Sequence, residues 1–163
     1  MKEIVIKRYG NIDLKDMINW SRIHSADLGG LRGICQGGYE AATIYKISSK
    51  YANLLSSLWF AADQCSSIFI PVHICDVDIY DAYENGEASE IALKLLQKYG
   101  HGNLTNLCEK VEDDIISETM KAEEKAEQLI ENGSKEEAIT LLTLSDIRMQ
   151  MNAIAIEKTW LGK

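Results

Sequence analysis

Residues 42–74 have the sequence ATIYKISSKYANLLSSLWFAADQCSSIFIPVHI and contain three short runs rich in β-branched and aromatic residues. These runs, at residues 42–47, 54–60 and 68–74, each have the length of an ordinary β-strand. The spacers between them are short and polar, which favours an antiparallel meander over long crossover connections. Pro71 lies inside the third run and cannot donate a ladder hydrogen bond, so we expect this run at a sheet edge or a bulge.

Downstream of the three runs, the apolar residues recur with the period of an α-helix. The pattern predicts one helix over residues 88–99, which Gly100 ends, and a second helix from about residue 103 to Asn132-Gly133. A capping-box pattern, Ser134-x-x-Glu137, opens a third helix. Because only a short turn joins the two long helices, we expect them to form an antiparallel hairpin.

Upstream of the three runs, residues 2–8 are predicted as a further short strand and residues 13–20 as one or two helical turns. The predicted fold is therefore α+β, with an antiparallel β-sheet region at residues 1–86. Residues 87–163 form a helical region that ends in the helical hairpin.

Composition limits the classes of partner. The 163 residues are 46% hydrophobic, which is enough apolar material for one domain with a real core. The net charge of −8 argues against binding nucleic acid, because that affinity comes largely from lysines and arginines on phosphates. No apolar stretch is long enough for a membrane span, and the start has no secretory pattern. We expect a soluble, cytoplasmic protein with no membrane partner.

The four cysteines are Cys35, Cys65, Cys75 and Cys108, and no two of them form a Cys-x-x-Cys pair. Without a secretory segment they are interpreted as free thiols. A metal site is the alternative, since a short stretch of the sequence brings together four ligand-type residues: Cys65, His73, Cys75 and Asp76. Their spacing matches no common zinc motif, so we expect neither a metal nor another cofactor.

One pair of residues suggests covalent catalysis. Cys35 follows Arg32 and Gly33, and a thiol beside an arginine and backbone amides can have a lowered pKa. His24 is the candidate general base for a Cys-His hydrolase. This hypothesis requires Cys35 to be accessible and within hydrogen-bond reach of His24.

The order of several short motifs resembles the C-terminal half of the N-terminal-nucleophile (Ntn) amide hydrolases. The similar groups are the dipeptidase D/secernin branch and the acyl-coenzyme A:6-aminopenicillanic acid acyltransferases. The matching residues are Arg22, His24, Ile34-Cys35-Gln36, Thr43, Leu58-Trp59-Phe60, Cys65-Ser66-Ser67, Phe69-Ile70-Pro71-Val72 and Asp78-Ile79-Tyr80-Asp81-Ala82-Tyr83. The resemblance covers about half of the chain and implies strands and helices of an αββα sandwich.

The resemblance implies a part or subunit of a linear amide C–N hydrolase or peptidase, acting on a dipeptide or an N-acyl compound. Those enzymes use a cysteine at a mature N-terminus, and nothing before Cys35 resembles that segment, so a missing segment or a partner chain would supply the nucleophile. The residues expected to bind substrate are Arg22, Trp59, Phe60 and Asp63. One sheet face should then be uncovered. The alternative is a non-enzymatic interaction or oligomerisation module, in which the acidic helical hairpin dimerises or docks a partner and the sheet is only a scaffold.

Overall fold

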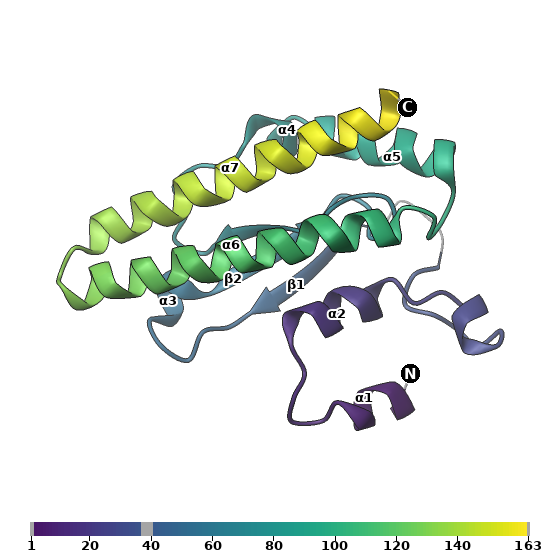
Figure 1. Ribbon diagram of the computed structural model, residues 1–163, viewed down its shortest axis with the longest axis horizontal. Coiled ribbons are helices and arrows are strands. Elements are labelled where there is room, and N and C mark those ends of the chain that lie inside the picture. The colour runs from purple at the N-terminus through teal and green to yellow at the C-terminus, as the bar shows by residue number, and fades with distance from the viewer. Residues whose placement is uncertain (1, 37–40, 163) are drawn as a thin grey trace.

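The computed structural model describes residues 2–36 and 41–162 and shows helices packed around one small antiparallel sheet (Figure 1). The predicted α+β class is thereby confirmed. In chain order the described elements are α1 (Lys2–Lys7), α2 (Leu14–Ser21), the 3-10 helix η1 (Ala26–Leu28), β1 (Ala42–Lys46), α3 (Ala52–Leu55), β2 (Ser57–Ala61), β3 (Ile70–His73), α4 (Asp81–Glu84), α5 (Glu87–Tyr99), α6 (Thr105–Glu131) and α7 (Lys135–Gly162).

The sheet has the order β1-β2-β3, and both strand pairs are antiparallel, as the short spacers predict. In the register, Ile44 lies opposite Trp59, and Trp59 lies opposite Pro71. Within the described chain β3 pairs only with β2, so Pro71 sits on an edge strand. The missing N–H of this proline therefore costs the sheet no hydrogen bond.

Two of the predicted strands are shorter than their apolar runs. Leu54 and Leu55 end the short helix α3, where both side chains are buried in a small core with residues of α6 and α7. The third run joins the ladder only at Ile70, because side chains of the long helices take the two backbone N–H groups before it. Ile68 donates to Glu157 and Phe69 donates to Glu112, each at 2.8 Å.

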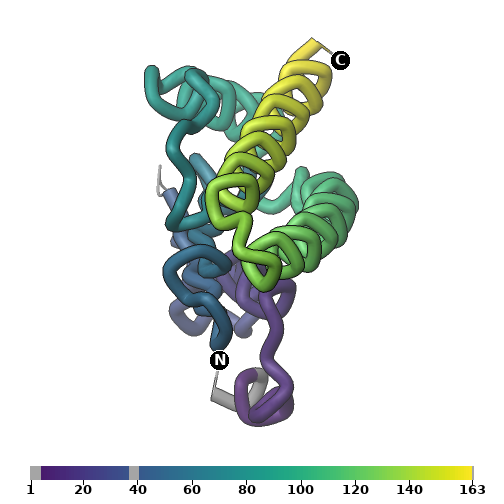
Figure 2. The backbone as a smooth tube through the Cα atoms, turned by 90° about the vertical axis from the view of Figure 1, so that its left-hand side faces the viewer, coloured from purple at the N-terminus to yellow at the C-terminus, as the bar shows by residue number. Residues whose placement is uncertain are grey.

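The helical hairpin is confirmed. The long helices α6 and α7 run antiparallel and are joined by three residues, among which Gly133 has a positive φ of 83°. Figure 2 shows the two helices as one layer beside the strands. Helix α5 is also confirmed and ends before Gly100. Over residues 2–36 and 41–162, no helix is both long enough and apolar enough to cross a bilayer.

At the free edge of β3, polar side chains of α7 form the hydrogen bonds that a neighbouring strand would otherwise form. Gln150 donates to the carbonyl of Pro71 at 3.1 Å, and its side-chain oxygen accepts from the N–H of Tyr80 at 2.9 Å. Asp146 accepts from the N–H of His73 at 2.9 Å. Both α7 side chains are fully buried, so the buried edge of the sheet meets hydrogen-bond partners rather than apolar atoms.

The strand predicted over residues 2–8 is wrong, because the segment forms helix α1 instead. β-branched residues favour a strand only when a partner strand lies alongside, since their preference is for packing on a pleated surface. Here helix α2 packs beside β1, and the exposed Ile6 shows that α1 lies away from the core.

Candidate metal centre

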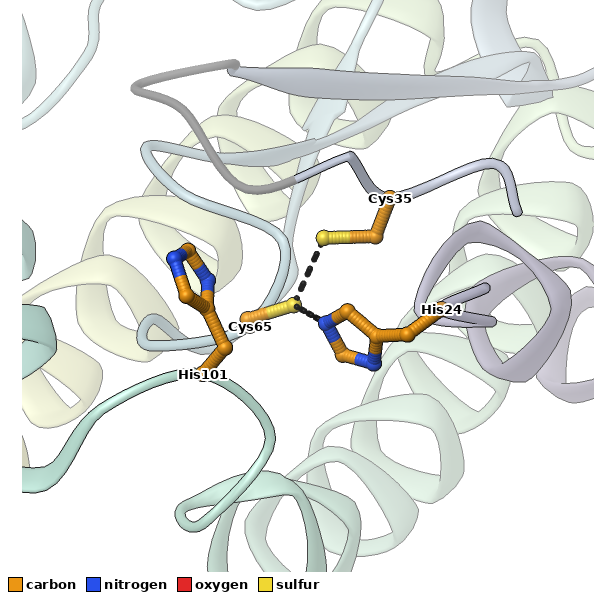
Figure 3. Close-up of side chains that lie close together, drawn as sticks. All are labelled: His24, Cys35, Cys65 and His101. Atoms are coloured by element: carbon orange, nitrogen blue, oxygen red, sulfur yellow. Dashed lines mark hydrogen bonds between the residues drawn. The ribbon is translucent and has the colours of Figure 1, made fainter. Parts of the chain in front are cut away.

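Four metal-ligating side chains from distant parts of the sequence gather around one sulfur atom (Figure 3). They are His24, Cys35, Cys65 and His101, and we call them the Cys/His cluster. The Sγ of Cys65 lies 3.0 Å from the Sγ of Cys35 and 3.1 Å from Nε2 of His24. One ligand-type atom from each residue lies within 4.8 Å of all the others. Both thiols are buried, and a surface cavity of about 320 Å³ opens onto the two histidines and Cys35.

A close approach of two backbone segments sets Cys35 beside His24. The N–H of Cys35 donates to the carbonyl of Ile23 at 3.0 Å. Between them, a Cβ atom on Gly33 would lie 2.4 Å from that same carbonyl oxygen and 2.5 Å from the carbonyl carbon of His24. Only glycine lets the chain pass so closely, so Gly33 is a geometric requirement of the cluster.

Asp27 lies beside His24 and binds its backbone. Its Oδ2 accepts a hydrogen bond from the backbone N–H of His24 at 2.8 Å and lies 3.6 Å from Nδ1 of the ring. A carboxylate near one ring nitrogen favours a proton there and leaves the other nitrogen free as a ligand. In His24 that other nitrogen is Nε2, which faces Cys65.

Cys65 is held in a tight turn between β2 and β3. The Oδ1 of Asp63 accepts from the backbone N–H groups of Cys65 and Ser66, each at 2.9 Å, and from the hydroxyl of Ser66 at 2.8 Å. This arrangement is an Asx turn, in which the side chain imitates a backbone acceptor. Asp63 therefore positions the thiol through the loop backbone.

Arg22 fixes the same loop from the other side. Its guanidinium donates to the carbonyls of Gln64 at 2.6 Å and Ser67 at 3.2 Å, and forms a bidentate pair with Glu112 of α6 at 2.6 and 2.7 Å. Burial opposes the charge, but the hydrogen bonds and charge of Glu112 outweigh it and hold the pKa of Arg22 above its ordinary value. The clamp ties the Cys65 loop to the end of α2 and to α6.

His101 reaches the cluster from the loop between α5 and α6. The glycines on either side, Gly100 and Gly102, have positive φ angles of 79° and 76°, which other residues rarely adopt. A Cβ on Gly102 would lie 3.5 Å from the ring of His24, so the two loops are in contact. The rings of His24 and His101 meet edge to face, with centroids 6.1 Å apart.

The electrostatics of Cys65 disfavour a free nucleophile. Burial raises the pKa of the Cys65 thiol well above its ordinary range, and the neighbouring Cys35 raises it further. A nucleophilic cysteine needs the opposite shift, since the thiolate is the reactive form. A bound cation would reverse this balance, because coordination to a metal deprotonates a thiol outright.

The Cys-His pair predicted from the sequence is only partly assembled. His24 and Cys35 belong to the same cluster, but Cys35 is 5% exposed and its sulfur contacts Cys65. The His24 ring nitrogen contacts Cys65 instead of Cys35. Cys35 is buried, although a surface cavity reaches it, and the Cys35 hydrolase hypothesis stays a prediction.

The four residues expected to bind substrate do not share one open pocket. Arg22 and Asp63 are buried within the clamp and the turn described above. Trp59 is 1% exposed and contributes to the wall of a cavity of about 710 Å³ between α2, β1 and α6. Phe60 is half-buried on the opposite sheet face, where it packs edge to face on Tyr83. Their role in substrate binding stays a prediction.

The four ligand-type residues that are close in sequence, Cys65, His73, Cys75 and Asp76, do not form one site in the structure. Cys65 joins the Cys/His cluster, whereas His73 and Asp76 lie in a second group with Asp146. Cys75 belongs to neither group, and its thiol donates to the carbonyl of Leu54 at 3.2 Å. All four cysteines are free thiols.

The sequence did not predict that His101, an exposed loop histidine, belongs to the cluster. The signal for it was the Gly-His-Gly sequence of residues 100–102, since two flanking glycines allow a loop to turn a side chain back onto the core. No local pattern linked His101 to Cys65, because 36 positions separate them (101 − 65).

Comparison with known proteins adds no relative to this description: the chain matches no protein family, no curated protein and no solved structure. The resemblance to Ntn amide hydrolases therefore stays a prediction from the sequence.

Proposed function

We propose that this chain binds one transition-metal ion, with zinc preferred, through His24, Cys35, Cys65 and His101. The observation that carries the proposal is the gathering of four ligand-type atoms within 4.8 Å of one another, from three segments that are far apart in sequence. Two sulfur and two imidazole ligands are typical of tetrahedral zinc sites.

The distances in the cluster suit such an ion after a small adjustment. With metal–ligand bonds of about 2.0–2.3 Å, the ligand atoms of a tetrahedral zinc site lie roughly 3.4–3.8 Å apart. The two Sγ atoms, now 3.0 Å apart, need to separate by about 0.8 Å, and Cys65 Sγ, now 3.1 Å from His24 Nε2, by about 0.4 Å. Asp27 supplies the carboxylate that usually supports a ligating histidine.

The role that this ligand set supports is structural. Four protein ligands fill a tetrahedral zinc ion and leave no position for substrate. The ion would join the segment after α2, the loop between β2 and β3, and the loop between α5 and α6. It would therefore stabilise the end of the molecule where loops rather than regular elements meet.

The test is metal content and cobalt spectroscopy of the purified full chain under reducing conditions. We expect one zinc ion per chain, and after exchange with Co²⁺ we expect thiolate-to-cobalt charge-transfer absorption with intense tetrahedral d–d bands. Cys65→Ser should abolish both signals. Cys75→Ser removes a thiol outside the cluster and should leave both unchanged.

Three outcomes would contradict the proposal. The first is a chain that takes up no stoichiometric zinc or cobalt although its thiols are reduced. The second is an equal loss of the signal in the Cys75→Ser control. The third is a Cys35–Cys65 disulfide that forms readily and excludes metal, because the adjacent sulfurs would then serve as a redox pair.

A second candidate function is the amide hydrolase that the sequence resemblance implies, with a partner chain supplying the nucleophile. It is favoured by one observation, a partly uncovered sheet face, as expected for half of an αββα sandwich. On that face Tyr45 is 70% exposed, and the paired Leu58 and Val72 are only half-buried. Native mass determination with identification of co-purifying chains tests it. A stoichiometric partner with an N-terminal cysteine supports it, and a chain without such a partner excludes it.

A further inference from the structure

A second group of metal-ligating residues lies under the edge of the sheet, away from the Cys/His cluster. It consists of His73 at the end of β3, Asp76 in the following turn and Asp146 on α7, each with a ligand-type atom within 4.8 Å of the other two. Both carboxylates converge on one backbone donor, since the N–H of His73 donates to Asp76 Oδ2 at 2.8 Å and to Asp146 Oδ2 at 2.9 Å.

Each carboxylate of this group keeps one oxygen with no partner. Oδ1 of Asp146 and Oδ1 of Asp76 are buried and have no hydrogen-bond partner, and Asp146 as a residue is 0% exposed. A buried charged oxygen without a partner is costly, so proteins normally satisfy it with a donor or a cation. Two unpartnered carboxylate oxygens and one imidazole are ligand types that a metal ion could bind together.

We infer that His73, Asp76 and Asp146 bind a divalent first-row transition-metal ion. One imidazole nitrogen and two carboxylates suit harder ions such as Mn²⁺ or Fe²⁺ better than they suit the softer ions that thiolates select. Two negative charges match a divalent cation. Each aspartate can ligate through its unpartnered oxygen while its Oδ2 still accepts from the backbone of His73.

Glu123 supplies the second-shell contact that such a site needs. Its Oε1 lies 3.3 Å from Nε2 of His73, and its other carboxylate oxygen is bound by Lys46 at 2.5 Å. In the metal-free chain Nδ1 of His73 donates its proton to Oδ2 of Asp146 at 2.8 Å. A bound ion would displace that proton and take Nδ1 as its ligand atom, while Glu123 keeps the proton on Nε2.

A surface cavity lies beside this site. A surface cavity of about 550 Å³ is lined by His73 and Asp76, together with exposed apolar residues that include Val77 and Ile74. Asp76 is half-buried at the mouth, whereas Asp146 lies behind it.

In the metal-free chain, His73 and Asp76 hold their protons more tightly than usual. Burial disfavours a charged His73, but its hydrogen bonds to Asp146 and Glu123 raise its pKa to about 9. Burial and the adjacent Asp146 raise the pKa of Asp76 to about 8. The competing interpretation of the group is therefore a closed, proton-sharing network that takes up no ion.

The test uses Mn²⁺ as the probe on the reduced, chelator-stripped full chain. No other ion then occupies the site, and Mn²⁺ binds thiolates poorly, so it does not fill the Cys/His cluster. The electron paramagnetic resonance signal of free Mn²⁺ measures binding. We expect one saturable equivalent per chain, and at least a tenfold weaker affinity in Asp146→Asn. Asp78→Asn changes an exposed carboxylate in the same segment and should bind as the wild type does.

A second measurement locates the ion without a variant. Bound Mn²⁺ should broaden the ring signals of His73 in the NMR spectrum and spare those of His24 and His101. The inference is overturned if the wild-type chain leaves the free Mn²⁺ signal unchanged, as a closed proton-sharing network would. It is also overturned if the signals of His73 stay sharp, or if Asp78→Asn weakens binding as much as Asp146→Asn does.

Discussion

The guanidinium of Arg22 and the carboxylate of Glu112 form a bidentate ion pair in which both side chains are 3% exposed. The pair connects the end of α2 to α6, and each partner also binds backbone of the segment between β2 and β3. Arg22 donates to two carbonyls of the Cys65 turn, and Glu112 accepts from the N–H of Phe69. One buried interaction therefore joins the N-terminal segment, the sheet and the helical layer.

Replacing either partner of this pair is expected to be strongly destabilising. Arg22→Met leaves the carboxylate of Glu112 buried without its counter-charge, and removal of one partner of a buried pair costs about 3–5 kcal/mol of unfolding free energy. Urea denaturation followed by circular dichroism measures this loss. Arg148→Ala breaks the exposed pair with Glu118 and should cost less than about 1 kcal/mol. Equal losses in the two variants would show that the buried pair has no special role.

Gly33→Ala is expected to disrupt the Cys/His cluster. The added Cβ would lie 2.4 Å from the carbonyl oxygen of Ile23, so the two backbone segments must separate and carry Cys35 away from His24. We expect at least a tenfold loss of Co²⁺ affinity together with a lower melting temperature. Gly162→Ala is the matched control, because a Cβ there meets nothing within 4 Å. Unchanged cobalt affinity in Gly33→Ala would show that this close approach does not position the ligands.

Local patterns account for what the sequence predicted correctly. The helical hairpin follows from apolar residues at helical spacing and from the Asn132-Gly133 turn, all of which lie within a few residues of one another. The antiparallel sheet follows in the same way from short runs joined by short spacers. The predicted strand over residues 2–8 failed because β propensity takes effect only where a partner strand is available.

The Cys/His cluster depends on contacts that no local pattern contains. His24, Cys35, Cys65 and His101 come from three segments. The Cys65 loop is bound by Arg22, which pairs with Glu112, 90 positions away in the sequence (112 − 22). Arg22 and Asp63 were predicted to bind substrate, and that role stays a prediction. The structure gives them backbone partners and a buried counter-charge, which a sequence cannot distinguish from contacts to a substrate.

Metal removal is expected to lower stability in a way that depends on Cys65. A ligand that binds only the folded chain, at about 1,000 times its dissociation constant, adds about 4.1 kcal/mol. For a domain of this size such a gain corresponds to about 8–16 °C in melting temperature. Chelator treatment of the zinc-loaded chain should produce this drop in calorimetry. Cys65→Ser should melt at the lower temperature whether or not chelator is present. A wild-type melting temperature that chelator does not change would refute the prediction.

Glu157 is expected to make the chain less stable as the pH rises. It lies on α7, where it is 1% exposed and accepts from the N–H of Ile68, and burial raises its pKa to about 8 from an ordinary value of 4.5. Between these two values the folded chain holds a proton that the unfolded chain has released. The free energy of unfolding therefore decreases as the pH rises from about 4.5 to about 8.

Glu157→Gln removes that titration while keeping an oxygen for the N–H of Ile68. The unfolding free energy of the variant relative to the wild type should therefore rise steadily from about pH 5 to pH 8, as measured by urea denaturation at each pH. Glu124→Gln, which changes an exposed carboxylate on α6, provides the comparison and should show no such trend. If the difference between Glu157→Gln and wild type stays constant with pH, Glu157 is not protonated in the folded chain, and the ionised carboxylate is held by Ile68 alone.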